Sequence, residues 1–162
     1  MAYDTDNVFA QILEGKMPAH KVFENEHTFA FMDIMPVSVG HTLIIPKAEA
    51  ENIFDLENEP GSEVFQTTKK IAHAIQASLK PSGLILTQLN GTDAGQTVFH
   101  YHMHIIPVYE KMPLRMHGKE VEDCEVLAKT AKIIEQALID MDSGLTRQKW
   151  KSQSNLSTII QC

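Results

Sequence analysis

Residues 96–109, QTVFHYHMHIIPVY, decide how the rest of this chain is interpreted. Three histidines, His100, His102 and His104, occupy every second position, and branched apolar residues follow at once. Alternate residues of a β-strand point to the same face of the sheet. The stretch therefore predicts a strand with a row of three imidazoles on one face and apolar side chains on the other.

Two explanations of this row involve no covalent chemistry. A zinc ion holds its nitrogen ligands at about 2.0–2.1 Å, whereas His100 and His104 lie roughly 13 Å apart along an extended strand. One ion therefore does not serve all three histidines, although His41 could complete a set of ligands with two of them. A polar strand face without chemistry is the other explanation, and it carries the cost of burying imidazoles without partners.

The third explanation is nucleophilic catalysis at phosphorus. A neutral imidazole nitrogen can attack phosphorus and form a phosphohistidine intermediate, which divides one difficult displacement into two easier ones. Neighbouring groups orient the attacking ring and transfer protons to the leaving atom. A row of three histidines offers places for all of these roles.

The composition limits the class of protein. The 162 residues are enough for one domain with a sizeable core, and the formal net charge of −7 argues against binding nucleic acid or an anionic membrane. Cys124 and Cys162 make no metal or disulfide pattern. The N-terminal residues lack the basic and apolar regions of a signal peptide, and no run is long enough to cross a bilayer. We expect a cytoplasmic protein.

The order of the expected elements predicts one α+β domain over residues 1–140, with a central, mostly antiparallel sheet. A short helix should begin after Asn7 and stop at Gly15, because these are good capping residues. Apolar periodicity predicts two main helices and about five strands. The helices are expected at residues 62–80 and about 122–140, and the strands at 20–24, 27–33, 41–46, 84–90 and 97–108. The C-terminal tail, residues 141–162, has no assigned role.

The histidine row resembles the signature of the histidine-triad family, His-φ-His-φ-His-φ-φ with φ apolar. Residues 100–106 match this signature fully, and residues 7–47 and 89–100 fit as well. The similarity runs in order over roughly residues 7–140. The chain looks like the Hint branch of nucleotide-binding phosphoramidases, because the galactose-1-phosphate uridylyltransferase branch has glutamine in place of His104. The resemblance implies a HIT-like domain whose sheet is extended across a two-fold homodimer.

The resemblance also implies roles for individual residues. His102 would attack the α-phosphorus of a purine nucleotide such as AMP, and three further histidines, His41, His100 and His104, would orient it and handle protons. Asp33 would accept hydrogen bonds from the ribose hydroxyls. The polar residues implied around the phosphate and the leaving group are Asn90, Gln96 and Thr97. The residues implied to form an apolar slot for the base are Val8, Phe9, Ile12, Phe31, Ile34 and Leu43.

Some of these residues also have a purely structural explanation. Asp33 and Asn90 could be turn residues, and Phe9 and Phe31 could belong to the ordinary core. The remaining histidines, at positions 20, 27, 73 and 117, have no partner pattern and are expected to be solvated or structural.

The chain departs from the family at one point. Many bacterial relatives carry Cys-x-x-Cys near the N-terminus and a further histidine after the IPK segment, and these residues form a structural zinc site with the first histidine of the triad. The corresponding residues here are Asn7, Ala10 and Glu49. Because both thiolates are missing, we expect no metal and no cofactor, and we expect His100 to be available to the active site.

The expected function is therefore hydrolysis of purine nucleoside 5′-phosphoramidates, or of related nucleotidyl substrates, through a covalent intermediate on His102. Two alternatives stay open: a dinucleoside polyphosphate hydrolase, and a nucleotide-binding regulatory module with negligible turnover. Few cations lie near the triad in sequence, since Lys111 and Arg115 come only after it. That scarcity suits a single phosphate group better than a polyphosphate chain.

Overall fold

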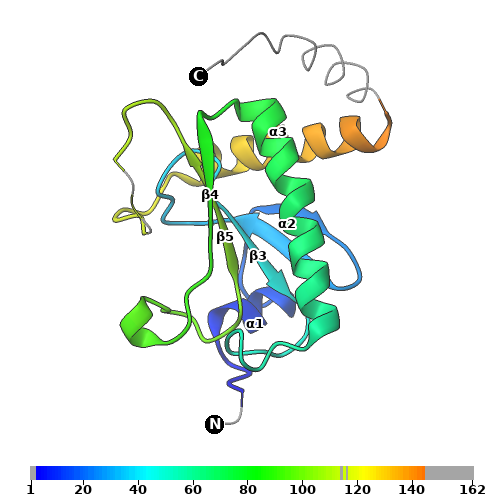
Figure 1. The fold of residues 1–162 in the computed structure, drawn as a ribbon, viewed down its shortest axis with the longest axis vertical. Helices are drawn as coiled ribbons and strands as arrows, with labels where there is room; N and C mark the ends of the chain where they lie inside the picture. The colour runs from blue at the N-terminus through cyan, green and yellow to red at the C-terminus, as the bar shows by residue number, and fades with distance from the viewer. Residues whose placement is uncertain (1–2, 114, 116, 145–162) are drawn as a thin grey trace, which may run out of the picture.

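The fold is built around one five-stranded antiparallel sheet with its strands in the order β1-β2-β3-β5-β4 (Figure 1). It is seen in a computed structural model, and the structure describes residues 3–113, 115 and 117–144. The strands are β1 (Lys21–Glu24), β2 (Thr28–Met32), β3 (Thr42–Pro46), β4 (Gly83–Thr87) and β5 (Met103–Val108). The helices are α1 (Val8–Leu13), α2 (Asn58–Leu79) and α3 (Cys124–Asp142), with a 3₁₀ turn, η1, at Thr92–Ala94. The predicted α+β architecture is confirmed.

The two faces of the sheet have different tasks. Ala30 and Met32 of β2 and Ile44 of β3 point into a core that α2 and α3 cover. Their neighbours Phe31 and Leu43 point to the opposite face, as the two-residue period of a strand requires. The helices complete the core with residues at the helical period: Val64, Ile71 and Ile75 of α2, and Leu127, Ile134 and Leu138 of α3. The face opposite these two helices is left for α1 and the histidines.

The helix boundaries follow from local chemistry. Asn7 caps α1 as predicted, because its Oδ1 accepts the N–H groups of Phe9 and Ala10, each at 3.0 Å. Helix α2 begins at Asn58, ahead of the predicted start at residue 62, and so includes Pro60. Proline is tolerated in a first turn because the N–H it lacks would have no helical acceptor there. The helix ends at Leu79, ahead of Pro81, as expected.

The strand predicted over residues 97–108 is wrong in its first half. Strand β5 begins at Met103, so only His104 of the three histidines lies in the regular sheet. Strand β4 ends at Thr87, which pairs with His104, and the N–H of Tyr101 donates instead to the carbonyl of Ala50 at 2.7 Å. Alternate residues still point to opposite sides, since Tyr101 joins the core under the helices.

Helix α3 ends at Asp142, inside the tail predicted for residues 141–162, and that tail lies outside the described residues from residue 145 onward. Among the described residues, no helix is both long and apolar enough to cross a membrane.

Candidate active site

The pairing of β3 with β5, together with the segments that lead into these two strands, brings four histidines together on the face of the sheet opposite α2 and α3. His104 pairs with Leu43 of β3, and His41 lies immediately before β3. The ring centroids of His102 and His104 are 4.9 Å apart, and those of His41 and His104 are 5.2 Å apart. His41, His100, His102 and His104 are all buried, with 1–4% of each exposed. The structure therefore brings together the four histidines that the sequence singles out.

His102 is held with a free lone pair on Nε2. Its Nδ1 lies 2.6 Å from the carbonyl oxygen of His100. A carbonyl only accepts hydrogen bonds, so the proton of His102 is on Nδ1 and Nε2 carries the lone pair. The ring of Phe9 lies edge-on to it, with centroids 5.1 Å apart. His102 thus has the neutral form that a nucleophilic imidazole needs.

His41 and His104 form a chain of hydrogen bonds that starts at the backbone. The N–H of Val37 donates to His41 Nδ1 at 3.1 Å, so the proton of His41 is on Nε2. That atom lies 3.0 Å from His104 Nδ1, which must accept, and the proton of His104 is therefore on Nε2. His104 Nε2 is buried and has no hydrogen-bond partner among the described residues. Since buried polar groups are nearly always bonded, the site presents this donor to a ligand.

His100 is hydrogen-bonded through both of its nitrogens. Its Nε2 donates to the carbonyl of Pro46 at 2.9 Å, so its Nδ1 accepts, and the hydroxyl of Tyr3 donates to it. Asn7 Nδ2 donates in turn to the Tyr3 hydroxyl oxygen at 2.9 Å. A hydrogen-bonded chain therefore connects the N-terminal cap of α1 with His100, whose own carbonyl holds His102 in place.

Asp33 follows β2 and lies beside His41. Its N–H donates to the carbonyl of His41 at 3.0 Å, its Oδ1 accepts the N–H of Met35, and its Oδ2 lies 3.4 Å from His41 Nδ1. Burial raises the pKa of the Asp33 carboxyl. Asp33, His41 and His104 bring three potential metal-ligand atoms within 4.8 Å of one another. The facing nitrogens of the two histidines already share a hydrogen bond, which a cation between them would have to displace.

The apolar residues predicted around the base gather next to the histidine row. Four of the six belong to one cluster on this face: Phe9, Ile12, Phe31 and Leu43. The rings of Phe9 and Phe31 meet edge to face at 5.4 Å, and Phe9 also contacts His102. The other two predicted residues, Val8 and Ile34, are 37% and 55% exposed. The cluster accordingly offers an apolar wall that ends at the proposed nucleophile.

The side-chain amide of Gln96 forms its hydrogen bonds with backbone groups. Its Oε1 accepts the N–H of Gly91 at 2.8 Å, and its Nε2 donates to the carbonyls of Glu51 and Val98 at 2.6 and 3.1 Å. Gln96 therefore shapes the loop between β4 and β5 from within, and its contact with a phosphate stays a prediction. The side chain of its neighbour Thr97 is exposed.

Asn90 also has protein partners. Its Oδ1 accepts the N–H of Ile53 at 2.9 Å, and its Nδ2 donates to the Gln88 side chain at 2.6 Å. Asn90 thereby ties the end of β4 to the segment between β3 and α2. Its contact with the phosphate also stays a prediction.

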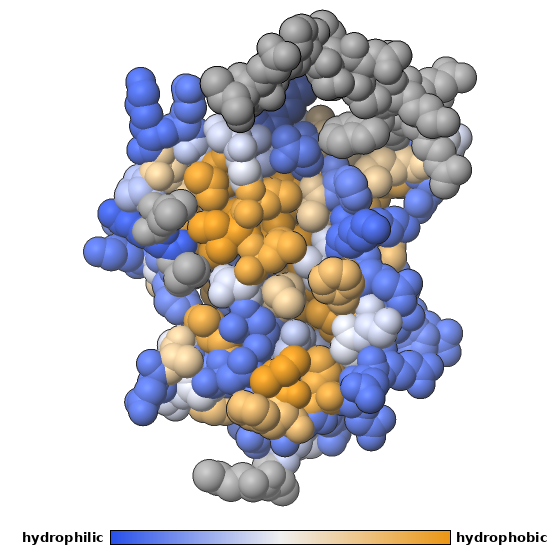
Figure 2. All heavy atoms as spheres, viewed as in Figure 1, coloured by the Kyte–Doolittle hydropathy of each residue, from blue (hydrophilic) through white to orange (hydrophobic). Residues whose placement is uncertain are grey.

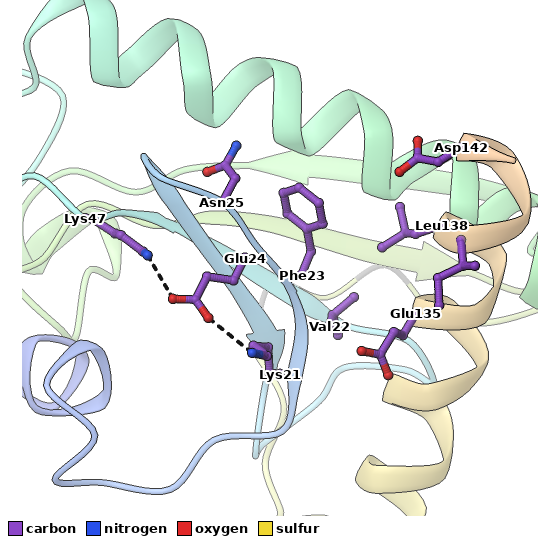
Figure 3. Close-up of a pocket in the computed structure, with 10 residues that line it drawn as sticks. Lys21, Val22, Phe23, Glu24, Asn25, Lys47, Glu135, Leu138 and Asp142 are labelled. Atoms are coloured by element: carbon purple, nitrogen blue, oxygen red, sulfur yellow. Dashed lines mark hydrogen bonds and ion pairs between the residues drawn. The ribbon is translucent and has the colours of Figure 1, made fainter.

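A separate hollow of about 480 Å³ lies at the β1 edge of the sheet, between β1 and α3 (Figure 3). Its two lysines pair with one carboxylate, since Glu24 accepts from Lys21 at 3.1 Å and from Lys47 at 2.8 Å. The described residues that line it include no histidine. We therefore place the candidate active site at the four buried histidines.

Comparison with known proteins identifies the family. Residues 14–111 match the family model of the HIT domain. The chain belongs to the HIT family. A Bacillus subtilis protein named Protein hit is 48% identical over 104 residues, which cover 64% of this chain and 72% of that protein. An adenosine 5′-monophosphoramidase from Schizosaccharomyces pombe is 38% identical over 100 residues, 62% of this chain and 72% of that enzyme.

A solved structure matches this HIT domain over most of its length. The Hit-like protein of Bartonella henselae, described as involved in cell-cycle regulation, has a TM-score of 0.79 and 36% identity. The match covers 85% of this chain and 99% of that protein. The agreement extends to the α+β fold with its open five-stranded sheet.

Two residues of this HIT site were not predicted from the sequence. Tyr3 lies far from the triad in the chain, and only the fold brings its hydroxyl to His100. His117 comes after the triad in a segment without a recognisable pattern, yet its ring lies edge-on to His104, with centroids 6.3 Å apart. The single sequence signal for His117 is the Gly118 that follows it, and this signal is weak.

Burial keeps the histidines uncharged. Loss of hydration lowers the pKa of His41 and of His100 to about 4 and that of His104 to about 3. It also lowers the pKa of His102, which the hydrogen bond to the His100 carbonyl partly opposes. Near pH 7 the four rings are therefore neutral, as the hydrogen-bond directions require.

We predict that the free energy of unfolding decreases as the pH falls from about 6.5 towards 4. The unfolded chain takes up protons on these histidines near their ordinary pKa of 6.5. In the folded chain the pKa of each is lowered, to about 4 for His41 and His100 and to about 3 for His104, so protonation favours unfolding. Asp33, with its raised pKa, opposes this trend but is one group against four. Chemical unfolding at pH 7.5 and 4.5 measures the effect, and a His104→Asn variant should show a shallower dependence. Equal stability at both pH values would contradict the prediction.

We also predict that Tyr3→Phe weakens the hold on His100. Without the hydroxyl, His100 Nδ1 loses its donor in a buried site, which costs roughly 1–3 kcal/mol. Long-range ¹H–¹⁵N NMR of the imidazoles detects the loss of this hydrogen bond. The Nδ1 resonance of His100 should move downfield, while His102 keeps its proton on Nδ1. Tyr109→Phe is the matched control, because its hydroxyl donates to the carbonyl of Val39 at 3.0 Å. An unchanged His100 resonance in Tyr3→Phe would show that the hydroxyl does not hold the ring.

Proposed function

We propose that this HIT protein hydrolyses purine nucleoside 5′-phosphoramidates, or related nucleotidyl substrates, through a nucleotidyl intermediate on His102. One observation carries the proposal: the ring of His102, whose Nε2 lone pair is free, neighbours the ring of His104, whose Nε2–H has no partner among the described residues. A phosphoryl group matches both atoms, since its phosphorus accepts the lone pair and an oxygen accepts the hydrogen bond.

The reaction then follows from the hydrogen-bond directions. His102 Nε2 attacks the α-phosphorus, and positive charge develops on the ring, whose Nδ1–H remains bonded to the His100 carbonyl. His104 Nε2–H donates to a phosphoryl oxygen. The hydrogen bonds from the Val37 N–H to His41 and from His41 to His104 keep the proton of His104 on Nε2. Water subsequently attacks the phosphorus and releases the nucleotide from His102. These fixed dipoles are in place before the reaction, which is the condition for strong electrostatic stabilisation.

The nucleoside half is proposed to lie along the apolar cluster. Phe9 and Phe31 present aromatic surface next to His102, and aromatic rings stack on any base without reading its identity. Asp33 directly follows β2 and lies beside His41, which directly precedes β3. It is proposed to accept hydrogen bonds from the ribose hydroxyls. The similar S. pombe protein, an adenosine 5′-monophosphoramidase, supports an AMP-like ligand. We place this activity in the cytoplasm, in line with the composition.

We predict that the wild-type protein hydrolyses adenosine 5′-phosphoramidate and that His102→Ala lowers turnover by at least about a thousandfold. The variant lacks the atom that forms the new bond to phosphorus. Mass spectrometry of the quenched wild-type protein should show a nucleotidyl adduct on the peptide that contains His102. His20→Ala is the control, because His20 immediately precedes β1 and is not one of the four buried histidines. Wild-type turnover by His102→Ala would refute the mechanism, and tight AMP binding without turnover would point to a regulatory module.

We further propose that the protein forms a two-fold homodimer through β4 and α2. Strand β4 is at the edge of the sheet, and an unpaired edge readily pairs with a second strand. Apolar side chains gather over β4 and the adjacent side of α2 (Figure 2). Phe65 and Leu86 are 64% and 49% exposed, and with Ala72 and Leu84 they line a shallow groove. A second copy would pair its β4 antiparallel to this one and bury the groove of both.

We predict that Leu86→Lys converts the dimer to a monomer, because it places two charges in the apolar interface. Light scattering coupled to size-exclusion chromatography measures the mass. Ile139→Lys is the matched control, since Ile139 is equally apolar and 56% exposed but lies on α3. A wild-type protein that is monomeric at micromolar concentration would contradict the proposal.

A further inference from the structure

The proposed mechanism does not use His117, which also lies beside the histidine row. Its ring lies edge-on to His104, with an interplanar angle of 88°. His117 Nε2 would also be only 3.1 Å from a Cβ atom built on Gly95. His117 thus lies close both to the last histidine of the row and to the loop that joins β4 to β5. In the proposed mechanism, this is the region next to the phosphorus.

The backbone holds His117 there. A Cβ atom built on Gly118 would be 2.0 Å from the carbonyl oxygen of Met35, so the chain can pass this point only as glycine. A few residues later, the N–H of Glu122 donates to the carbonyl of Ile34 at 2.9 Å. The segment around residues 118–122 is therefore fastened to the end of the β2–β3 hairpin, and His117 is carried with it to the edge of the site.

The surroundings of His117 differ from those of the other histidines. His41, His100, His102 and His104 are buried, whereas His117 is exposed to solvent. The buried rings exchange protons with water poorly, and burial keeps them neutral. An imidazole in contact with both solvent and the site can bring a proton from water and return it. Its charge also reaches the site, because it contributes to lowering the pKa of His41, His102 and His104.

We infer that His117 is a further catalytic residue, one that delivers a proton to the leaving atom. The inference rests on the proposed function and narrows its substrate class to esters and amidates whose leaving group must be protonated, amines above all. A phosphoramidate nitrogen is expelled only with difficulty as an anion. Its departure therefore depends on a nearby acid more strongly than the departure of an acidic phenol does.

The step balances in protons and electrons. His102 Nε2 donates its lone pair to phosphorus, and the P–N bond breaks with its electron pair on the leaving nitrogen. Protonated His117 gives one proton to that nitrogen and becomes neutral, and the amine leaves. In the second step water forms a bond to phosphorus and loses a proton to solvent, the P–N bond to His102 breaks with its electron pair on Nε2, and AMP is released, while His117 regains its proton from solvent. No oxidant, reductant or second substrate is needed.

The test compares two leaving groups on the same nucleotide. One substrate is an adenosine 5′-phosphoramidate with an alkylamine leaving group, and the other is the 4-nitrophenyl ester of AMP, whose phenolate leaves without a proton. We expect His117→Gln to lower kcat on the amidate by about 100-fold or more and on the ester by less than about threefold. His27→Gln is the matched control, because His27 is an exposed histidine in the β1–β2 turn.

A second variant tests whether the loss of activity comes from the missing imidazole itself. With His117→Ala, added imidazole should restore turnover of the amidate, since the free base can replace the missing ring, and it should not change turnover of the ester. Equal losses on both substrates, or no loss on the amidate, would overturn the role of His117. If the wild-type protein hydrolyses neither substrate, the proposed function itself fails, and the two failures are thereby distinguished.

Discussion

Desolvation of four neighbouring imidazoles is the constraint on which the rest of the site depends. A buried ring that stays neutral has one donor and one acceptor nitrogen, so each hydrogen bond fixes the direction of the next. The directions start at backbone groups that cannot reverse: the N–H of Val37 and the carbonyls of Pro46 and His100. The backbone therefore sets which nitrogen of His102 is free, and no charged side chain has to do so.

The sheet makes this arrangement possible because it separates packing from chemistry. Phe31, Leu43 and His104 are neighbours across β2, β3 and β5 through their register, and all three lie on the face away from α2 and α3. The helices supply the apolar core on the other face and leave this one to the candidate active site. His104 lies in β5, and His41 and His102 lie immediately before β3 and β5, so the paired strands anchor the segments that carry these rings.

The sequence predicted the parts of this design that repeat at short range. The alternation of His100, His102 and His104 with apolar residues, the Asn7 cap and the periodicity of α2 and α3 each reflect local geometry, and the structure confirms them. The strand over residues 97–108 was too long, because strand length depends on where the partner strand β4 ends. Tyr3, His117 and the inward bonds of Gln96 depend on contacts between distant segments, which no local pattern records.

The register of the β2–β3 hairpin has a consequence for how this chain can vary. Ala30 and Met32 face the helices while Phe29 and Phe31 face the site side, so neighbouring positions serve opposite surfaces. Replacing one of these residues disturbs a single surface. Inserting or deleting one residue within either strand would exchange the two surfaces over the rest of that strand and turn residues of the apolar cluster beside the histidines towards the core. The length of this hairpin is accordingly under a stricter constraint than its composition.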